Sequence, residues 1–429
     1  MSIFAIIVCL CIGVAWRRSE KNYYNPAALM GILWGIICFM ANLRSYGLYA
    51  ASDYTYFLIT LGIAFFGLGS YVAKSLKVKF SRGSIPRLAN PSCECEINYT
   101  VVRILCVVSV FLLLPSAISS AKLLMSGMDM SDIRTGEVVE KGGNIVIVLI
   151  NNYIVRPFSF AILPIFAVEF FVSKKRDTTI TICSIIIIIE RVLIEGGRFI
   201  IAYILCALLV SFAVTKRKKK IKKSIVITFW TIVAVSVIAI YIVTLSRGTE
   251  EIGRSLYAYI CGCVPHLSIR LDAMQNLDTY TFGLSSMNGI VHYIASIFEN
   301  LGASYPDFLM EVRELINVED KVVISDMGGQ FNAFVSPIYY MYIDGREIGV
   351  MIGMFIYGFV SYRLYAKLKQ NIYPRDLAIY LLIVQGLVTT MVRIQFSVTY
   401  YTIAFFFIVF LINQKKSSLE QPRTRWFQY

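Results

Sequence analysis

Long apolar runs separated by short polar segments are the dominant pattern along this chain. A helix that crosses a bilayer needs about 20 mostly apolar residues, with a range of about 17–25. The pattern predicts membrane-spanning helices near residues 2–16, 26–43, 54–73, 101–120, 144–172, 179–195, 197–214, 224–244, 345–366, 376–393 and 396–412. The expected fold is therefore an all-α polytopic membrane protein with about 11 transmembrane helices.

The composition agrees with this pattern. The chain is 57% hydrophobic and 16% charged, with a mean hydropathy of +0.67, whereas soluble domains are about 45–50% apolar and about 25% charged. These values exclude a cytosolic enzyme, a secreted disulfide domain and a disordered chain. Neither C-x-C pair, Cys93/Cys95 or Cys261/Cys263, has the spacing of a structural zinc site. We therefore expect no metal and no cofactor.

The basic residues predict the orientation in the membrane. They cluster in every second loop, beginning with Arg17 and Arg18 after the first span and ending in the C-terminal tail. Cytoplasmic loops carry the excess of lysine and arginine in membrane proteins. The N-terminus is therefore predicted outside and the C-terminus in the cytoplasm. Because positive charge follows the first apolar run, Ile3–Ala15, we expect a span there rather than a cleaved signal peptide.

Sorting the charge by side changes the meaning of the net charge of +14. The predicted inner side has 27 basic and six acidic residues, so most of the excess reports topology and suggests no nucleic-acid partner. The remaining 14 basic residues are 11 arginines and three lysines, Lys122, Lys141 and Lys321. Arginine binds phosphate and carboxylate groups bidentately and tolerates partial burial better than lysine. This bias indicates an anionic ligand on the outer face.

The chain divides into three parts. Residues 1–244 hold spans one to eight with short loops, 245–344 form a long extracytoplasmic loop, and 345–429 hold the last three spans and a basic tail. A structureless loop of that length is improbable. We expect amphipathic helices over Ile252–Leu277, Ser285–Leu301 and Pro306–Ile316, and a segment at Phe331–Tyr342 that dips into or lies on the membrane. These helices would cap the outer mouth of the bundle.

Arginines in or beside the spans on the outer side are the main candidates for ligand binding, because charges placed there are costly and by default suggest function. Arg198 and Arg247 are favoured because neighbouring glycines let a ligand approach the backbone N–H groups. The alternative for any single arginine is an interfacial anchor, or a pair with Glu190 or Asp272. The full set of candidates is Arg134, Arg156, Arg198, Arg247, Arg270 and Arg346.

The chain has two histidines, His266 and His292, and both fall in the long outer loop. Either is a candidate general base. The alternative for each is an ordinary hydrogen-bonded loop residue. The sequence has no Walker A loop, no G-x-G-x-x-G and no G-x-S-x-G motif, so nucleotide-driven work and serine hydrolysis have no support.

Several short motifs accompany this architecture. They are Gly196-Gly197-Arg198 at a span start, Ser246-Arg247-Gly248 after a span, and Tyr259 through Pro265 followed by Thr281-Phe282-Gly283. With the long late outer loop, they resemble bacterial O-antigen or capsule repeat-unit polymerases of the Wzy type. The Arg-x10-Gly spacing described for some members occurs only at Arg375 and Gly386, on the predicted cytoplasmic side. Roles tied to that spacing are therefore not transferred.

The resemblance implies a GT-C-like fold in the bacterial cytoplasmic (inner) membrane and an enzyme of O-antigen, lipopolysaccharide or capsule synthesis. Such a glycosyltransferase joins undecaprenyl-diphosphate-linked oligosaccharides on the outer face without a nucleotide. Membrane lipids and a chain-length regulator are the further implied partners. Arg198 and Arg247 would bind the diphosphate, Arg270 and Arg346 would support them, and His292 would be the base. Arg247 and His266 are further catalytic candidates.

Two rival functions stay open. An O-antigen ligase has the same general build and similar arginines, but it transfers glycan to the lipid A core. A lipid-linked oligosaccharide flippase or another transporter would show two similar halves and charges along a path from both sides. The long outer loop and the one-sided arginines count against a transporter, whereas nothing in the sequence separates polymerase from ligase.

Overall fold

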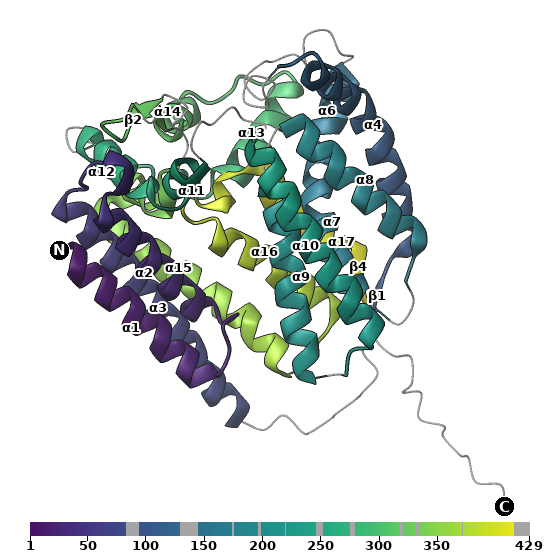
Figure 1. The fold of residues 1–429 in the computed structure, drawn as a ribbon, viewed down its shortest axis with the longest axis horizontal. Helices are drawn as coiled ribbons and strands as arrows, with labels where there is room; N and C mark the ends of the chain where they lie inside the picture. The colour runs from purple at the N-terminus through teal and green to yellow at the C-terminus, as the bar shows by residue number, and fades with distance from the viewer. Residues whose placement is uncertain are drawn as a thin grey trace, which may run out of the picture.

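The computed structural model describes residues 1–82, 94–128, 145–173, 176–195, 199–218, 220–245, 252–274, 279–317, 321–328, 330–331, 334–370 and 372–415. These residues are almost wholly helical (Figure 1). The first half consists of α1 (Ser2–Glu20), α2 (Pro26–Leu43), η1 (Ser45–Gly47), α3 (Asp53–Arg82), β1 (Glu94–Ile97), α4 (Tyr99–Met125), α6 (Ile145–Ile150), η2 (Asn151–Val155), α7 (Arg156–Phe171), α8 (Thr178–Glu195) and α9 (Phe199–Lys218).

The second half begins with one more long apolar helix and continues with shorter helices before the last long one. Its elements are α10 (Lys223–Leu245), α11 (Ile252–Cys261), α12 (Cys263–Met274), α13 (Asn288–Asn300), α14 (Asp307–Ile316), β2 (Val322–Val323), β3 (Gln330–Phe331), α15 (Ser336–Gln370), α16 (Pro374–Val388), η3 (Gln395–Ser397), α17 (Thr399–Leu411) and β4 (Ile412–Lys415). Helices α11 to α14 lie across one end of the bundle, at the top of Figure 1.

Within the described residues, eight helices are long and apolar enough to cross a membrane: α1, α2, α3, α4, the α6–α7 stretch, α9, α10 and α15. The all-α polytopic fold is thus confirmed. The count of eleven spans stays a prediction for a physical reason. Helix α8 carries Glu190, Arg191 and Glu195, while α16 and α17 have only 15 and 13 residues.

Helix α15 is 35 residues long but breaks at Gly345 and Arg346, whose backbone angles are not helical. The break falls where the sequence predicts the start of a span. Before it, the residues from Ser336 to Asp344 are all buried. The start of this buried segment is held in place by the amides of Val335 and Ser336. Both amides donate to the carbonyl of Val392 in the loop after α16. The predicted dipping segment therefore overlaps a helix enclosed by protein.

Glycines allow two helix pairs to pack at backbone distance. A Cβ on Gly69 of α3 would lie 2.0 Å from the Phe355 carbonyl oxygen of α15, and one on Gly358 of α15 would lie 2.1 Å from the Phe66 carbonyl oxygen of α3. Gly31 of α2 faces α1 in the same way. Small residues at such contacts are typical of helix pairs in membranes, where close van der Waals packing drives association.

Two hydrophobic cores meet along α16, which lies near the centre of Figure 1. One core joins α4, α7, α8, α9 and α17, and includes Leu382 of α16. The other joins α1, α2, α3, α12 and the first part of α15, and includes Ile383 and Leu387. Because successive positions on α16 point into different cores, this helix holds the two halves together.

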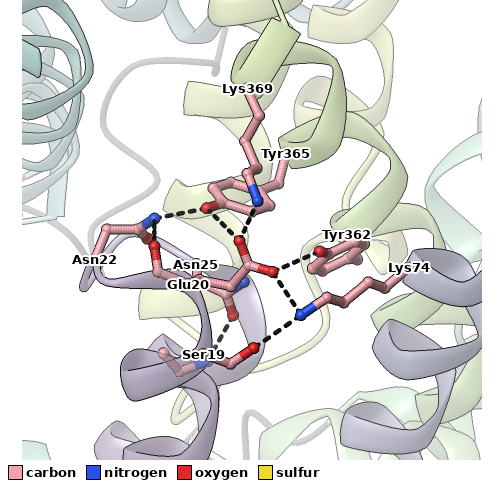
Figure 2. A network of polar contacts seen from close by, with 9 residues as sticks. Ser19, Glu20, Asn22, Asn25, Lys74, Tyr362, Tyr365 and Lys369 are labelled. Carbon is pink, nitrogen blue, oxygen red and sulfur yellow. Dashed lines mark hydrogen bonds and ion pairs between the residues drawn. The ribbon is translucent and has the colours of Figure 1, made fainter. Parts of the chain in front are cut away.

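A buried carboxylate ties α1, α3 and α15 together (Figure 2). It lies at the C-terminal end of α1, which points away from α11–α14 in Figure 1. Glu20 closes α1, and its side chain is 1% exposed. It accepts from Lys74 of α3 at 3.0 Å, from the Tyr362 hydroxyl of α15 at 2.9 Å and from Lys369 of α15. The Tyr365 hydroxyl also donates to it, at 3.4 Å. Each oxygen thus faces one ammonium and one hydroxyl, which compensates the cost of burying the charge.

Two further contacts join chain segments at this end of the bundle, which we call the basic end because Lys74, Lys367 and Lys369 lie there. Strands β1 and β4 pair antiparallel, with Ile97 opposite Ile412, and so tie the start of α4 to the end of α17. Asp177 caps α8 by accepting from the Ile180 amide at 3.1 Å, and Arg103 of α4 pairs with the same carboxylate. The Arg103 guanidinium holds the pKa of Asp177 below its ordinary value, so this cap is charged at neutral pH.

Candidate functional site

The described candidate residues all lie towards the end formed by α11–α14, but in separate clusters. Arg270 is beside His266 on α12, Arg346 is at the break in α15, Arg156 is at the start of α7, and His292 is on α13. Arg134, Arg198 and Arg247 lie outside the described residues, so their roles stay predictions.

His266 is fully buried and both of its ring nitrogens are used. Arg270 donates from Nε to Nε2 across 3.2 Å, so the ring proton lies on Nδ1, which donates to the Phe334 carbonyl at 3.2 Å. Burial and the adjacent Arg270 charge lower the pKa of His266 to about 4. This neutral histidine therefore orients Arg270 and is poorly placed to take a proton from a ligand.

Arg346 is held between aromatic rings at the α15 break. Its Nη1 donates to the Met274 carbonyl at 2.9 Å, and its guanidinium carbon lies 5.0 Å from the ring centre of Tyr342 and 5.6 Å from that of Tyr280. Its φ of 53° and ψ of −140° are in a sparsely populated backbone region, which costs an L-residue roughly 1–3 kcal/mol. Strained residues of this kind cluster at functional sites.

Asp344, one residue before the break, anchors the loop that carries Tyr280. Its carboxylate accepts from the Thr281 hydroxyl at 2.5 Å, from the Ser285 amide at 3.0 Å, and from the amide of Ser286 at 3.1 Å as well as its hydroxyl. The Phe282 amide donates to the Asp344 carbonyl at 3.0 Å. Sequence reasoning missed this residue, because its partners lie some sixty positions earlier in the chain.

Arg156 begins α7 directly after η2, a π-helical turn, and such turns are frequent at functional sites. Its guanidinium carbon lies 4.7 Å from the ring centre of Tyr400, and its Nη2 lies 4.0 Å from Oε1 of Glu195. Glu195 also pairs with Arg191 one turn earlier on α8. Because Glu195 is the last residue before Gly196-Gly197-Arg198, Arg156 lies close to the start of the predicted diphosphate-binding turn.

His292 is half-buried on α13. Its Nδ1 is 2.9 Å from the Tyr305 hydroxyl, and the Ser296 hydroxyl lies 3.4 Å from both ring nitrogens. Burial and the charge of Arg313 lower the pKa of His292, while Glu299 acts in the opposite sense. The imidazole is therefore neutral at pH 7, which is the form that a general base needs.

No group of three His, Cys, Asp or Glu side chains suited to a metal ion occurs in the part of the chain that the structure describes. The arrangement instead offers arginines fixed by hydrogen bonds and rings, a neutral histidine and a partly exposed carboxylate at Glu195. These groups suit the binding of a phosphate or carboxylate and the movement of one proton.

No protein-family model matches the chain, and neither the curated proteins nor the solved structures include a match.

Proposed function

We propose that the protein is a membrane glycosyltransferase that joins undecaprenyl-diphosphate-linked oligosaccharide repeat units into an O-antigen or capsular polysaccharide on the outer face of the bacterial cytoplasmic membrane. The observation that carries the proposal is how Arg156, Arg270 and Arg346 are held. A histidine nitrogen, a backbone carbonyl and tyrosine rings orient them, all at the end of the bundle away from the lysine-rich end. Preorganised guanidinium groups of this kind suit a diphosphate.

The proposed reaction needs no nucleotide. The acceptor sugar hydroxyl attacks the anomeric carbon of the donor, the bond between that carbon and the phosphate oxygen breaks, and its electron pair leaves with the lipid diphosphate. Arg156 and Arg270 stabilise the charge that develops on the leaving group. His292 takes the hydroxyl proton, because its lowered pKa keeps it unprotonated at neutral pH. Arg198 and Arg247 keep their predicted roles on the diphosphate.

The apolar outer surface of the bundle suits the lipid part of such a substrate. Helix α10 exposes Trp230, Ile238 and Ile242, and α4 exposes Ile104 and Phe111. An isoprenoid tail can therefore stay in the bilayer against these helices while its diphosphate reaches the arginines at their outer ends.

Deleting the gene and complementing it with variants tests the proposal. The deletion should leave single repeat units on the surface anchor, and the wild-type gene should restore a ladder of glycan lengths on a gel. Arg270→Gln and Arg156→Gln should each shorten or abolish that ladder, because the leaving charge loses its partner. Arg254→Gln is the matched control, since Arg254 is a partly exposed arginine of α11 that donates to the Met327 carbonyl.

The outcomes separate the alternatives. A normal ladder in the deletion strain would refute polymerisation by this protein. Loss of all surface glycan would favour a flippase or ligase, and the lipid-linked pool would then show whether long chains accumulate unattached. A wild-type ladder in both arginine variants, with normal protein levels, would refute the assigned site but not the function.

A further inference from the structure

We infer that a row of aromatic side chains on either side of Arg346 is a binding surface for a glycan chain. The members of the row that a ligand can reach are Tyr54, Tyr280 and Phe282, whereas the ring of Tyr342 is buried and links them as support. The choice of a glycan as the occupant rests on the proposed function, whereas the row itself is a feature of the structure.

Ring contacts connect the members of the row. The ring centres of Tyr54 and Tyr342 are 6.3 Å apart, and those of Tyr280 and Phe282 are 6.2 Å apart. The Arg346 guanidinium joins the two pairs, because it lies over both Tyr342 and Tyr280. The row therefore runs from the start of α3, across the α15 break, to the loop before α13.

The outer part of the row is exposed and yet fixed. Phe282 is 86% exposed and Tyr280 is 47% exposed. Phe282 has a φ of 49°, a conformation that a bulky L-residue rarely adopts. The backbone around it is pinned on both sides, because Thr281 and Ser286 bind the Asp344 carboxylate. This exposed phenyl ring contributes little to the core, and its face is open to a ligand.

The chemistry of the row fits sugar rings. The C–H face of a pyranose packs on an aromatic ring, whose face is electron-rich. Sugar hydroxyls can exchange hydrogen bonds with tyrosine hydroxyls, with guanidinium N–H groups and with a carboxylate. Glu347 supplies that carboxylate at the half-buried end of the row, where the Tyr54 hydroxyl donates to it. Arg346 also suits a carboxylate on an acidic sugar.

A membrane interface is the competing occupant, because aromatic residues also form belts at the two surfaces of a bilayer. Such a belt follows the lipid-facing sides of the spans. This row instead crosses the end of the bundle from one helix to a loop, and it includes a guanidinium held between two rings. A glycan that leaves the arginine clusters along this end therefore fits the row better than lipid does.

Binding to the full-length protein in detergent tests the inference. The probe is the oligosaccharide released by mild acid from the lipid-linked pool of the host, with maltohexaose as a neutral comparison. The wild type should bind the host oligosaccharide, and Phe282→Ala and Tyr280→Ala should each raise its Kd by about tenfold, since each removes one stacking face. Phe282→Trp should retain binding. Phe308→Ala is the matched control, because Phe308 is a 57%-exposed phenylalanine of α14.

Three results would overturn the inference: no binding by the wild type, an equal loss in Phe308→Ala, or quenching of Phe282→Trp fluorescence by brominated lipids in vesicles with no response to the oligosaccharide. The last result would assign the row to the membrane. Failure of the proposed function is distinguishable from these. If the deletion strain still polymerises while the purified protein binds glycan through Phe282, the glycan-binding surface is supported and the polymerase function is refuted.

Discussion

Arg270 donates a hydrogen bond to His266 one turn earlier on the same helix, and His266 donates a hydrogen bond from Nδ1 to the Phe334 carbonyl. The two contacts fix the tautomer of the imidazole and the direction of the guanidinium together. His266 thus orients an arginine and is kept neutral by burial, while its role as a base stays a prediction.

The low pKa of His266 predicts a pH-dependent stability. The folded state binds this proton only near pH 4, whereas the unfolded chain binds it near 6.5. The free energy of unfolding therefore has its full value, as far as His266 is concerned, above about pH 6.5. It falls by about 3 kcal/mol in total as the pH drops towards 4. His266→Gln can keep both hydrogen bonds but does not titrate. Its Tm in detergent should fall less than that of the wild type between pH 6.5 and 5, and parallel curves would contradict the prediction.

Removing the buried carboxylate at the basic end should destabilise the fold strongly. Glu20→Gln leaves two ammonium groups facing a neutral amide. Because Lys74 and Lys369 are 37% and 47% exposed, solvent screens them, and the cost is about 1.5–3 kcal/mol. Lys369→Met should cost less, because Lys74 still pairs with Glu20 and Lys369 is 47% exposed. The Tm values of both single variants and of the double variant give the interaction energy between Glu20 and Lys369. Equal losses in the two single variants would argue against Glu20 as the centre of the network.

The glycine contacts between α3 and α15 should not tolerate a methyl group. Gly69→Ala and Gly358→Ala each place a Cβ about 2 Å from a backbone carbonyl oxygen, so the helices must separate at a cost of about 1–3 kcal/mol or more. Gly345→Ala is the control, since no described atom lies within 4 Å of the position of its Cβ and its φ of −176° is open to any residue. The Tm values of the three variants test this prediction. A Tm of Gly358→Ala as high as that of Gly345→Ala would refute the tight contact.

Asp344 should protect the loop amides that it accepts from. In Asp344→Asn, one carboxylate oxygen becomes an NH₂ group that faces other donors. Hydrogen exchange at the Ser285 and Ser286 amides should become about tenfold faster as their acceptor weakens. Amides within α13 serve as the internal control, because their acceptors belong to the helix itself. Unchanged protection in the loop would mean that the carboxylate does not hold it.

Labelling of single cysteines tests the predicted orientation. In a background without the ten native cysteines, Phe282→Cys should react with a membrane-impermeant maleimide on intact cells. Lys367→Cys, on a side chain that is exposed at the basic end, should react only after permeabilisation. The reverse pattern would place the arginine clusters in the cytoplasm and would exclude the proposed reaction on the outer face.

The hydrophobic pattern predicted the helices well because each apolar run carries its own signal. It placed a span start at residue 345, where Gly345 and Arg346 interrupt the apolar stretch. It could not show that the preceding tyrosine-rich segment is an enclosed helix, since burial by other helices has no local signature. The pairing of Arg270 with His266 could have been predicted from the sequence, because residues four apart lie on the same face of a helix.

Other features depend on contacts between distant parts of the chain. Glu20 meets Lys369 across 349 positions, and Asp344 meets Ser285 across 59. Neither pair forms a motif in the sequence. The short motif Thr281-Phe282-Gly283 is visible in the sequence, but only the structure shows an exposed ring held in place there.

The glycine-mediated contact between α3 and α15 has a mechanical consequence. At Gly69 and Gly358 the two backbones are in direct contact, so one helix can slide past the other there only if the helices first separate. Tyr54 and Lys74 belong to one of these helices, and Arg346 and Lys369 to the other. We therefore expect a tilt of either helix at the aromatic row to be transmitted along the pair to the lysines around Glu20.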